Sequence, residues 1–197
     1  LDAEIAPMST TMLVMDKATG ETSRKAVTLS KDEGNRADTT LEGLNSLKPV
    51  FGSGETVEQG QFITAGNASQ LSDGAAAVVL MEKEAAKKAG LKPMARLVSY
   101  GLAGVDPKIM GIGPVTAVQN ALKRAGLKVE DMDVIESNEA FAVQALAVSC
   151  DLNFDPKKTN PNGGAVGLGH PIGATGALLT VKALYELQRT GGRYALV

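Results

Sequence analysis

The chain has 197 residues, a formal net charge of −2 and 44% hydrophobic residues, enough apolar side chains for a substantial core. The small net charge and the absence of a long lysine and arginine cluster argue against a surface for nucleic acid or for an anionic membrane. No apolar run reaches the ~18 residues of a membrane span. One cysteine and one histidine argue against a disulfide framework and against a structural zinc site.

The first 71 residues are polar and rich in loops, which predicts a loose α+β region. The expected elements are, in chain order, a hairpin of strands at 11–16 and 24–29, a charged loop at 31–38 that contains Arg36, a short helix that starts at a Thr39/Glu42 capping box and runs through Leu47, a loop at 49–60 that carries Phe51, and a short strand at 62–65. A polar turn at 66–74, which contains Ser69, ends this region.

From residue 75 onward, apolar runs and helical patterns alternate, which predicts a largely parallel, layered α/β core. The run 75–81 is apolar throughout, as expected for a strand that is covered on both faces. The expected order is a strand at 75–81, a helix at 82–89, a strand at 95–100, a helix at 114–125, a strand at 134–136, a helix from about 139 to 150, a helix that begins at Pro171 and a final strand at the end of the sequence.

The stretch Asn160–Gly176 contains six glycines, two prolines and His170, the only histidine of the sequence. Glycine permits positive φ and a close approach of the backbone, so this segment is expected to bend sharply against a neighbour. Pro171 suits the first turn of a helix and keeps His170 extended. A helix amino terminus disfavours an imidazolium ion, so we predict a largely neutral His170 at pH 7 that accepts a proton or a hydrogen bond. The alternative is a histidine that only caps or packs.

Asn138 lies between the expected strand 134–136 and the helix that follows it. Ligands of α/β proteins gather at the carboxyl ends of strands, where helix amino termini point. Asn138 and His170 occupy comparable junctions, so their side chains can converge on one ligand, although an ordinary helix cap is the alternative for Asn138. Cys150, near the carboxyl end of its helix, is poorly placed for a thiolate and is expected to be a small buried core residue.

Three common catalytic and nucleotide-binding motifs are not found in the sequence. Gly167 and Gly169 fail the dinucleotide fingerprint because its third glycine position is Ile172. The sequence has no Gly-Lys-Ser/Thr of a phosphate-binding loop and no Gly-x-Ser-x-Gly of a nucleophile elbow. Taken alone, Ser69 reads as a turn hydroxyl.

Two segments together resemble the thiolases, the acyltransferases that cleave or form 3-ketoacyl-CoA. They are Asn138-Glu-Ala-Phe-Ala142 and Gly163-Gly-Ala-Val-Gly-Leu-Gly-His-Pro-Ile-Gly-Ala-Thr-Gly-Ala177. The segment 66–76 resembles the coenzyme A-binding turn of that family, and 106–114 also matches. The related ketoacyl synthases share a Gly-His-x-x-Gly-Ala theme but typically have a second histidine where this chain has Asn138.

The resemblance implies roles for individual residues. His170 matches the histidine that activates the nucleophilic cysteine and helps to bind the thioester oxygen, and Asn138 matches the residue that holds a water in the first oxyanion hole. The implied coenzyme A contacts are Ser69 at the pantetheine, Arg36 and Phe51 near the nucleotide part, and Ala140 and Phe141 along the pantetheine tunnel.

One feature departs from the family. Thiolases carry a nucleophilic cysteine in the amino-terminal half and a second cysteine in a Cys-x-Gly-Gly-Gly stretch, and neither stands in this sequence. We therefore expect a carboxyl-terminal half of a thiolase, short of its last strand or two and inactive alone. The expected fold is α/β, a thiolase-like layered α-β-α core. Residues 1–71 are expected to form the later part of the loop domain, 72–92 a strand-helix unit of the amino-terminal core domain, and 93–197 the carboxyl-terminal core domain.

The function that the resemblance implies is acyl transfer between coenzyme A and acyl-CoA. The expected partners are coenzyme A, acyl-CoA and 3-ketoacyl-CoA, with no cofactor beyond coenzyme A as substrate, no metal, no nucleic acid and no membrane span. The family suggests a homodimer or homotetramer in the cytoplasm, or in mitochondria or peroxisomes of a eukaryote. A non-catalytic acyl-CoA-binding or assembly fragment and a ketoacyl synthase relative are the alternatives.

Overall fold

The computed structural model describes residues 4–32, 34–52, 54 and 57–197. The chain divides into two units, Leu1–Asp38 and Thr39–Val197, which we describe separately. Within the described part, no helix combines the length and the apolar character needed to cross a membrane.

The first unit contains a hairpin of β1 (Met8–Met15) and β2 (Thr22–Leu29). The strands are antiparallel, and their register runs from Met8 opposite Leu29 to Met15 opposite Thr22. Asp16 closes the turn, because its carboxylate accepts hydrogen bonds from the N–H groups of Ala18 and Thr19 at 2.7 and 3.1 Å. The predicted hairpin is confirmed, with both strands starting two or three residues earlier than expected.

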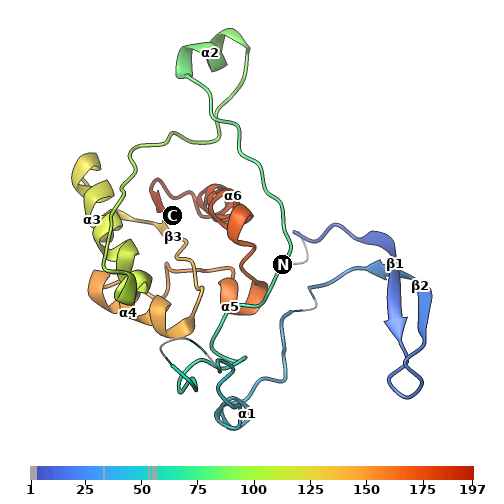
Figure 1. Cartoon of the computed structure of the whole chain (residues 1–197). Coiled ribbons are helices and arrows are strands. Elements are labelled where there is room, and N and C mark those ends of the chain that lie inside the picture. The colour runs from blue at the N-terminus through green and yellow to red at the C-terminus, as the bar shows by residue number, and fades with distance from the viewer. Residues whose placement is uncertain (1–3, 33, 53, 55–56) are drawn as a thin grey trace. The chain divides into compact units, whose positions relative to one another are not determined.

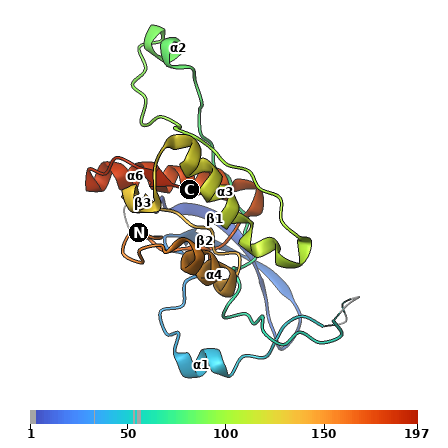
Figure 2. The same ribbon diagram turned by 90° about the vertical axis from the view of Figure 1, so that its left-hand side faces the viewer.

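The second unit is α/β, as predicted. Its only described strands outside isolated bridges, β3 (Val134–Ile135) and β4 (Ala195–Leu196), are parallel neighbours. The helices are α1 (Leu41–Asn45), α2 (Lys83–Lys88), α3 (Gly113–Ala125), α4 (Ala142–Leu152), α5 (Ala165–Leu168) and α6 (Ile172–Thr190), with short 3₁₀ turns η1 (Pro107–Ile112) and η2 (Val129–Asp131). Helix α6 packs against β3 and β4, and α3 packs against α4 (Figures 1 and 2).

The core of the second unit forms where α3 and α4 meet β3. The α3 periodicity predicted one apolar side, and that side faces the core, with Leu122 buried and Val115 and Val118 packed against it. Burial of such side chains removes apolar surface from water and supplies most of the stabilisation. The buried cluster consists of Leu122, Met132, Ile135, Val148, Leu152 and Phe154.

Two predicted strands are not strands in the structure. Residues 75–81 and 95–100 have no strand assignment, and Val79, for example, is 86% exposed. An extended segment becomes a strand only beside a hydrogen-bonding neighbour, and no segment of the described residues pairs with either stretch.

The segment around residue 100 is instead held along α3. The side chains of Asn120 and Arg124 donate to the carbonyl oxygens of Leu102 and Tyr100 at 3.1 and 2.8 Å. Gly101 allows this approach, because a Cβ atom at this position would overlap the carbonyl oxygen of Ala117. Side chains of a helix thus replace the expected strand ladder.

Smaller differences occur at element boundaries. The helix expected from Thr39 begins after Thr40, whose hydroxyl accepts from the N–H of Gly43 at 3.0 Å, so the Thr39/Glu42 box is wrong by one residue. Residues 62–65, expected as a strand, have no strand assignment. Helix α5 was not predicted, because a four-residue helix inside a glycine-rich loop has no periodicity to detect. Helix α6 follows the prediction, although Pro171 is its N-cap and not its first residue.

Helix α6 is tied to the loop before α5 through a buried carboxylate. Glu186 accepts from Arg189 Nε and Nη2 at 2.8 and 2.6 Å and from Asn162 Nδ2 at 2.9 Å. Glu186 is only 4% exposed. The hydrogen bonds from Arg189, with a smaller contribution from the bond of Asn162, lower the pKa of Glu186 from 4.5 to about 2.

We expect Glu186 to make the stability of the fold depend on pH. A carboxyl group with a lowered folded-state pKa binds fewer protons when folded, so its contribution is complete above about pH 4.5 and disappears as the pH falls toward 2. The shift corresponds to about 3 kcal/mol, and we expect about 2 kcal/mol because Arg189 is 68% exposed. Urea unfolding at pH 6 should show Glu186→Gln less stable than the unsubstituted chain, with a difference that shrinks at pH 3. A difference that is the same at both pH values would contradict this.

Candidate functional site

Asn138 and His170 lie on two different loops and meet in space. Asn138 follows β3, and His170 immediately precedes the N-cap of α6. Asn138 Nδ2 lies 3.4 Å from His170 Nε2, at the long end of the hydrogen-bond range. The structure therefore brings together the two residues that the sequence placed at strand and helix junctions.

Asn160 joins the loop of Asn138 to the loop of His170. Its Oδ1 accepts from the N–H of Ser137 at 2.8 Å, and its Nδ2 donates to the carbonyl oxygen of Ser137 at 2.9 Å. The same Nδ2 donates to Glu139 Oε1 at 2.7 Å. Asn160 thus holds both residues that flank Asn138, and it does so from a left-handed backbone conformation with φ 47°.

Glu139 extends this connection toward His170. Its second carboxylate oxygen, Oε2, accepts from the N–H of Val166 in the first turn of α5 at 3.2 Å. Only glycine fits at position 164 in this arrangement, since a Cβ atom there would overlap the Glu139 carboxylate. A chain of hydrogen bonds therefore runs from Ser137 through Asn160 and Glu139 to α5, which ends two residues before His170.

The turn that carries Ser69 pairs with the segment after Asn138. The N–H of Ser69 donates to the carbonyl oxygen of Ala140 at 2.9 Å, and Ala68 forms an antiparallel bridge with Phe141. This pairing keeps 140–141 extended and explains why α4 begins at Ala142 and not at Glu139 as expected. Ser69, Ala140 and Phe141 are consequently neighbours.

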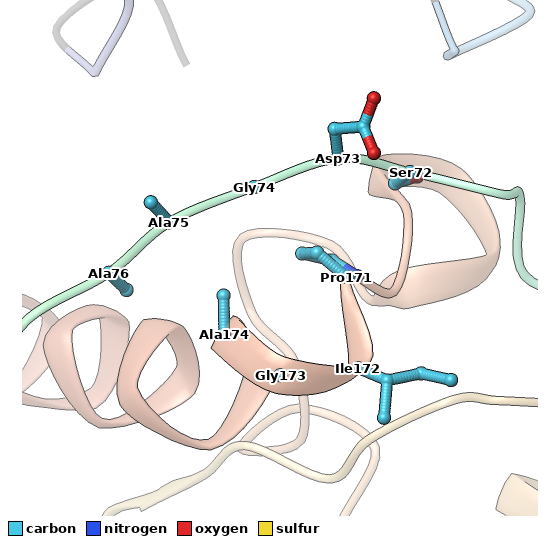
Figure 3. A pocket seen from close by; sticks show the side chains of 9 residues that line it. All are labelled: Ser72, Asp73, Gly74, Ala75, Ala76, Pro171, Ile172, Gly173 and Ala174. Atoms are coloured by element: carbon cyan, nitrogen blue, oxygen red, sulfur yellow. The ribbon is translucent and has the colours of Figure 1, made fainter.

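The continuation of that turn covers the start of α6. Gln70 Nε2 donates to the carbonyl oxygen of Gly167 at 3.0 Å. Residues 72–76 then run in extended form over Pro171 and the first turn of α6 (Figure 3). Between them lies a surface pocket of about 310 Å³, lined by 72–76 and 171–174. It adjoins the His170 loop through Pro171 but does not include Asn138 or His170.

The remaining predicted residues lie elsewhere. Phe51 is 58% exposed in its loop, where its carbonyl oxygen accepts from the N–H of Gly60 at 2.7 Å. Arg36 belongs to the first unit and stays a prediction from the resemblance. Cys150 is exposed on α4, so the expectation that it is a buried core residue is wrong.

The pair of Asn138 and His170 can interact with a polar ligand. The Asn138 Oδ1 atom is buried, and among the described residues it has no hydrogen-bond partner. A buried carboxamide with an unused acceptor is suited to a water molecule or to a polar group of a substrate. Within the described residues no cluster of three or more histidine, cysteine, aspartate or glutamate side chains could hold a metal ion.

Sequence reasoning missed three residues that contact the pair or its loops: Glu139, Asn160 and Thr175, whose Oγ1 lies 2.7 Å from His170 Nδ1. Glu139 and Asn160 act through hydrogen bonds between segments that are 21 residues apart, and no local pattern signals such a bond. The available signal for Thr175 was its position at the start of a helix directly after His170.

Comparison with known proteins gives a consistent result. The family model described as the thiolase N-terminal domain matches residues 1–84, and the one described as the thiolase C-terminal domain matches 91–197. Beta-ketothiolase BktB of Cupriavidus necator is 62% identical over 171 residues, which are 87% of this chain and 42% of that relative. The mitochondrial 3-ketoacyl-CoA thiolase of Bos taurus is 52% identical over 169 residues, 86% of this chain and 41% of the relative.

Solved structures give the same result as the sequence comparisons. The acetyl-CoA acetyltransferase of Bacillus anthracis superposes with a TM-score of 0.77 at 48% identity, covering 94% of this chain and 44% of that structure. Human mitochondrial 3-ketoacyl-CoA thiolase in complex with CoA superposes with a TM-score of 0.74 at 48% identity, covering 86% and 41%. The chain thus spans less than half the length of these four relatives.

Proposed function

Because the chain belongs to the thiolase family, we propose that it forms the part of a thiolase that holds a coenzyme A thioester and polarises its carbonyl group. The reaction is acyl transfer between coenzyme A and acyl-CoA. In one direction 3-ketoacyl-CoA and CoA give acyl-CoA and acetyl-CoA, and in the other two acetyl-CoA molecules give acetoacetyl-CoA and CoA. A cysteine carries the acyl group between the two half-reactions.

The observation that supports this proposal is the meeting of Asn138 and His170 at 3.4 Å. A neutral imidazole in that position can remove a proton from a thiol or return one to a leaving group. The Asn138 carboxamide holds a water that donates to the thioester oxygen, in keeping with its unused buried acceptor. An oriented donor at a developing oxyanion contributes about 3 kcal/mol to the lowering of the barrier.

Coenzyme A is proposed to bind along the Ser69 turn. Ser69, Ala140 and Phe141 are adjacent, which suits a narrow passage for the pantetheine arm, and Arg36 and Phe51 are proposed to contact the nucleotide part. The relative whose structure was solved with CoA supports a coenzyme A ligand for this family.

The nucleophilic cysteine is proposed to come from outside the printed sequence. Cys150, the only cysteine, is exposed near the carboxyl end of α4, whereas the side chains that contact the ring nitrogens of His170 are those of Asn138 and Thr175. The chain by itself is therefore inactive in acyl transfer. The same observation favours the second candidate, a non-catalytic acyl-CoA-binding or assembly fragment.

The proposal also covers the domain organisation of the chain and the oligomeric state and cellular location of the assembled protein. Residues 72–92 form a unit that completes an amino-terminal core domain, and the exposed apolar side chains of Val78, Val79, Leu80 and Met81 support a partner segment there. Residues 1–71 belong to a loop domain and 93–197 to the carboxyl-terminal core. The assembled protein is proposed to be a homodimer or homotetramer that takes part in fatty acid metabolism, in the cytoplasm or, in a eukaryote, in mitochondria or peroxisomes.

A chimera tests the proposed function. In it, residues of this chain replace the matching 171 residues of the Cupriavidus necator relative, which supplies the rest. We expect the chimera to catalyse CoA-dependent cleavage of acetoacetyl-CoA, and we expect the 197-residue chain alone to show no activity. The assay follows the loss of the acetoacetyl-CoA absorbance. Activity of the chain alone that Cys150→Ser abolishes would overturn the assignment of the nucleophile, and a folded but inactive chimera would favour the non-catalytic candidate.

A further inference from the structure

His170 has a second partner on the side away from Asn138. Its Nδ1 lies 2.7 Å from Thr175 Oγ1, and Thr175 is 93% buried in the first turns of α6. The Thr175 hydroxyl in turn donates to the carbonyl oxygen of Pro171 at 3.0 Å. The imidazole is therefore held between a carboxamide on one nitrogen and a hydroxyl on the other.

The number of available protons fixes the direction of these bonds. A hydroxyl group carries one hydrogen, and the carbonyl of Pro171 can only accept. When Thr175 donates to Pro171, its oxygen can only accept from His170, so Nδ1 must carry the proton. The opposite side agrees, because Asn138 presents its NH₂ group to Nε2, which must then offer a lone pair.

From this we infer that Thr175 selects the Nδ1–H tautomer of neutral His170 and leaves the Nε2 lone pair facing Asn138. In water a histidine side chain prefers the opposite, Nε2–H tautomer, so the protein reverses the intrinsic preference. The bond that one ring nitrogen makes decides which nitrogen is protonated. Thr175 touches neither substrate nor nucleophile in this scheme and is a positioning residue.

The consequence for chemistry rests on the proposed function. The nitrogen that accepts a proton from a thiol must face the site, and in the Nδ1–H tautomer that nitrogen is Nε2. In the other tautomer Nε2 already carries a proton and cannot act as a base. Thr175 therefore keeps His170 in the form that accepts a proton.

Helix α6 provides a matched control. Thr180 makes the same bond from its hydroxyl to the carbonyl four residues earlier, Gly176, at 2.8 Å. This bond involves no ring nitrogen, so Thr180→Val removes a helix-internal bond like that of Thr175 without removing a partner of His170. Thr175→Val and Thr180→Val each replace a β-branched residue with another of similar shape. Only Thr175→Val also removes the hydrogen-bond partner of the His170 imidazole.

The test uses the only histidine of the chain as its own reporter. In the ¹⁵N-labelled 197-residue chain, all imidazole signals belong to His170. At about pH 8.5, long-range ¹H–¹⁵N correlation spectra distinguish the protonated from the unprotonated ring nitrogen. We expect Nδ1–H in the unsubstituted chain and in Thr175→Ser and Thr180→Val, and mainly Nε2–H in Thr175→Val. Nε2–H in the unsubstituted chain, or an unchanged tautomer in Thr175→Val, overturns the inference.

The chimera supplies a second readout. Thr175→Val should lower the kcat of the chimera about 10- to 100-fold, by analogy with the partners that orient metal-bound imidazoles, with KM changed by less than about threefold. Thr175→Ser, which keeps the hydroxyl, should retain most of the activity. A rise in KM with unchanged kcat, or an equal loss in Thr180→Val, would contradict the positioning role. An inactive unsubstituted chimera would count against the proposed function alone, because the tautomer measurement does not depend on activity.

Discussion

Replacing His170 with asparagine is expected to lower the kcat of the chimera by at least about 10³-fold. Loss of a general base costs about 10²- to 10⁴-fold. Once Nε2 has accepted the thiol proton, its N–H can donate to the oxyanion, and loss of such a donor costs a further factor of about 10² to 10³. Contributions of groups that act together do not add, so the smaller figure is the secure one. Asparagine keeps a polar group of similar size beside Asn138 and Thr175, which limits structural damage. Steady-state cleavage of acetoacetyl-CoA measures the effect.

Two controls separate chemistry from folding. Circular dichroism of the His170→Asn chimera should match that of the parent, and coenzyme A binding measured by calorimetry should change by less than about threefold, since the proposed coenzyme A contacts lie along the Ser69 turn. Thr180→Val on the same helix should keep full activity. If His170→Asn retained more than about a tenth of the parental kcat with an intact fold, His170 would not be the base.

Asn160→Ala is expected to destabilise the chain by about 2–3 kcal/mol and to reduce the kcat of the chimera about 100-fold. The substitution removes three hydrogen bonds, two of them to the backbone of Ser137 and one to Glu139. A lost partner leaves part-buried donors and acceptors without a hydrogen bond, which costs about 1–3 kcal/mol for a single group. The total is smaller than the sum of the three losses, because the groups around Asn160 relax together. Asn138 is flanked by both of the residues that Asn160 holds, so its carboxamide should leave His170. Urea unfolding and the acetoacetyl-CoA assay measure the two effects.

The control for Asn160 is Asn153→Ala. Among the described non-glycine residues only these two asparagines have positive φ, 50° at Asn153 and 47° at Asn160, so alanine meets the same backbone strain at both positions. Asn153 caps α4, away from the His170 loop, and its replacement should cost about 1 kcal/mol in stability without an effect on kcat. Equal loss of activity in both variants would show that strain, and not the link between the two loops, explains the result.

Patterns with a local physical cause were predictable. The hairpin of β1 and β2, the apolar side of α3 and the position of α6 follow from turn chemistry, helical periodicity and the conformations of proline and glycine. The strands predicted at 75–81 and 95–100 are wrong. An apolar composition shows that a segment can be buried in a sheet, but a strand forms only beside a neighbour with free backbone hydrogen-bonding groups. The predicted start of α4 is wrong for a related reason. The bridge between Ala68 and Phe141 keeps the residues before Ala142 extended, and these residues would otherwise belong to the helix.

The sequence by itself determined the family and named the chemically important pair, because the glycine-rich segment around His170 and the segment that begins at Asn138 are both continuous in the chain. Only the tertiary structure decided how that pair is held. The bonds of Asn160 to Ser137 and Glu139 span more than 20 residues, and the bond of Thr175 to His170 depends on how the ring is turned. Hydrogen bonds act over about 3 Å, so which donor meets which acceptor is settled when the loops are packed together and not before.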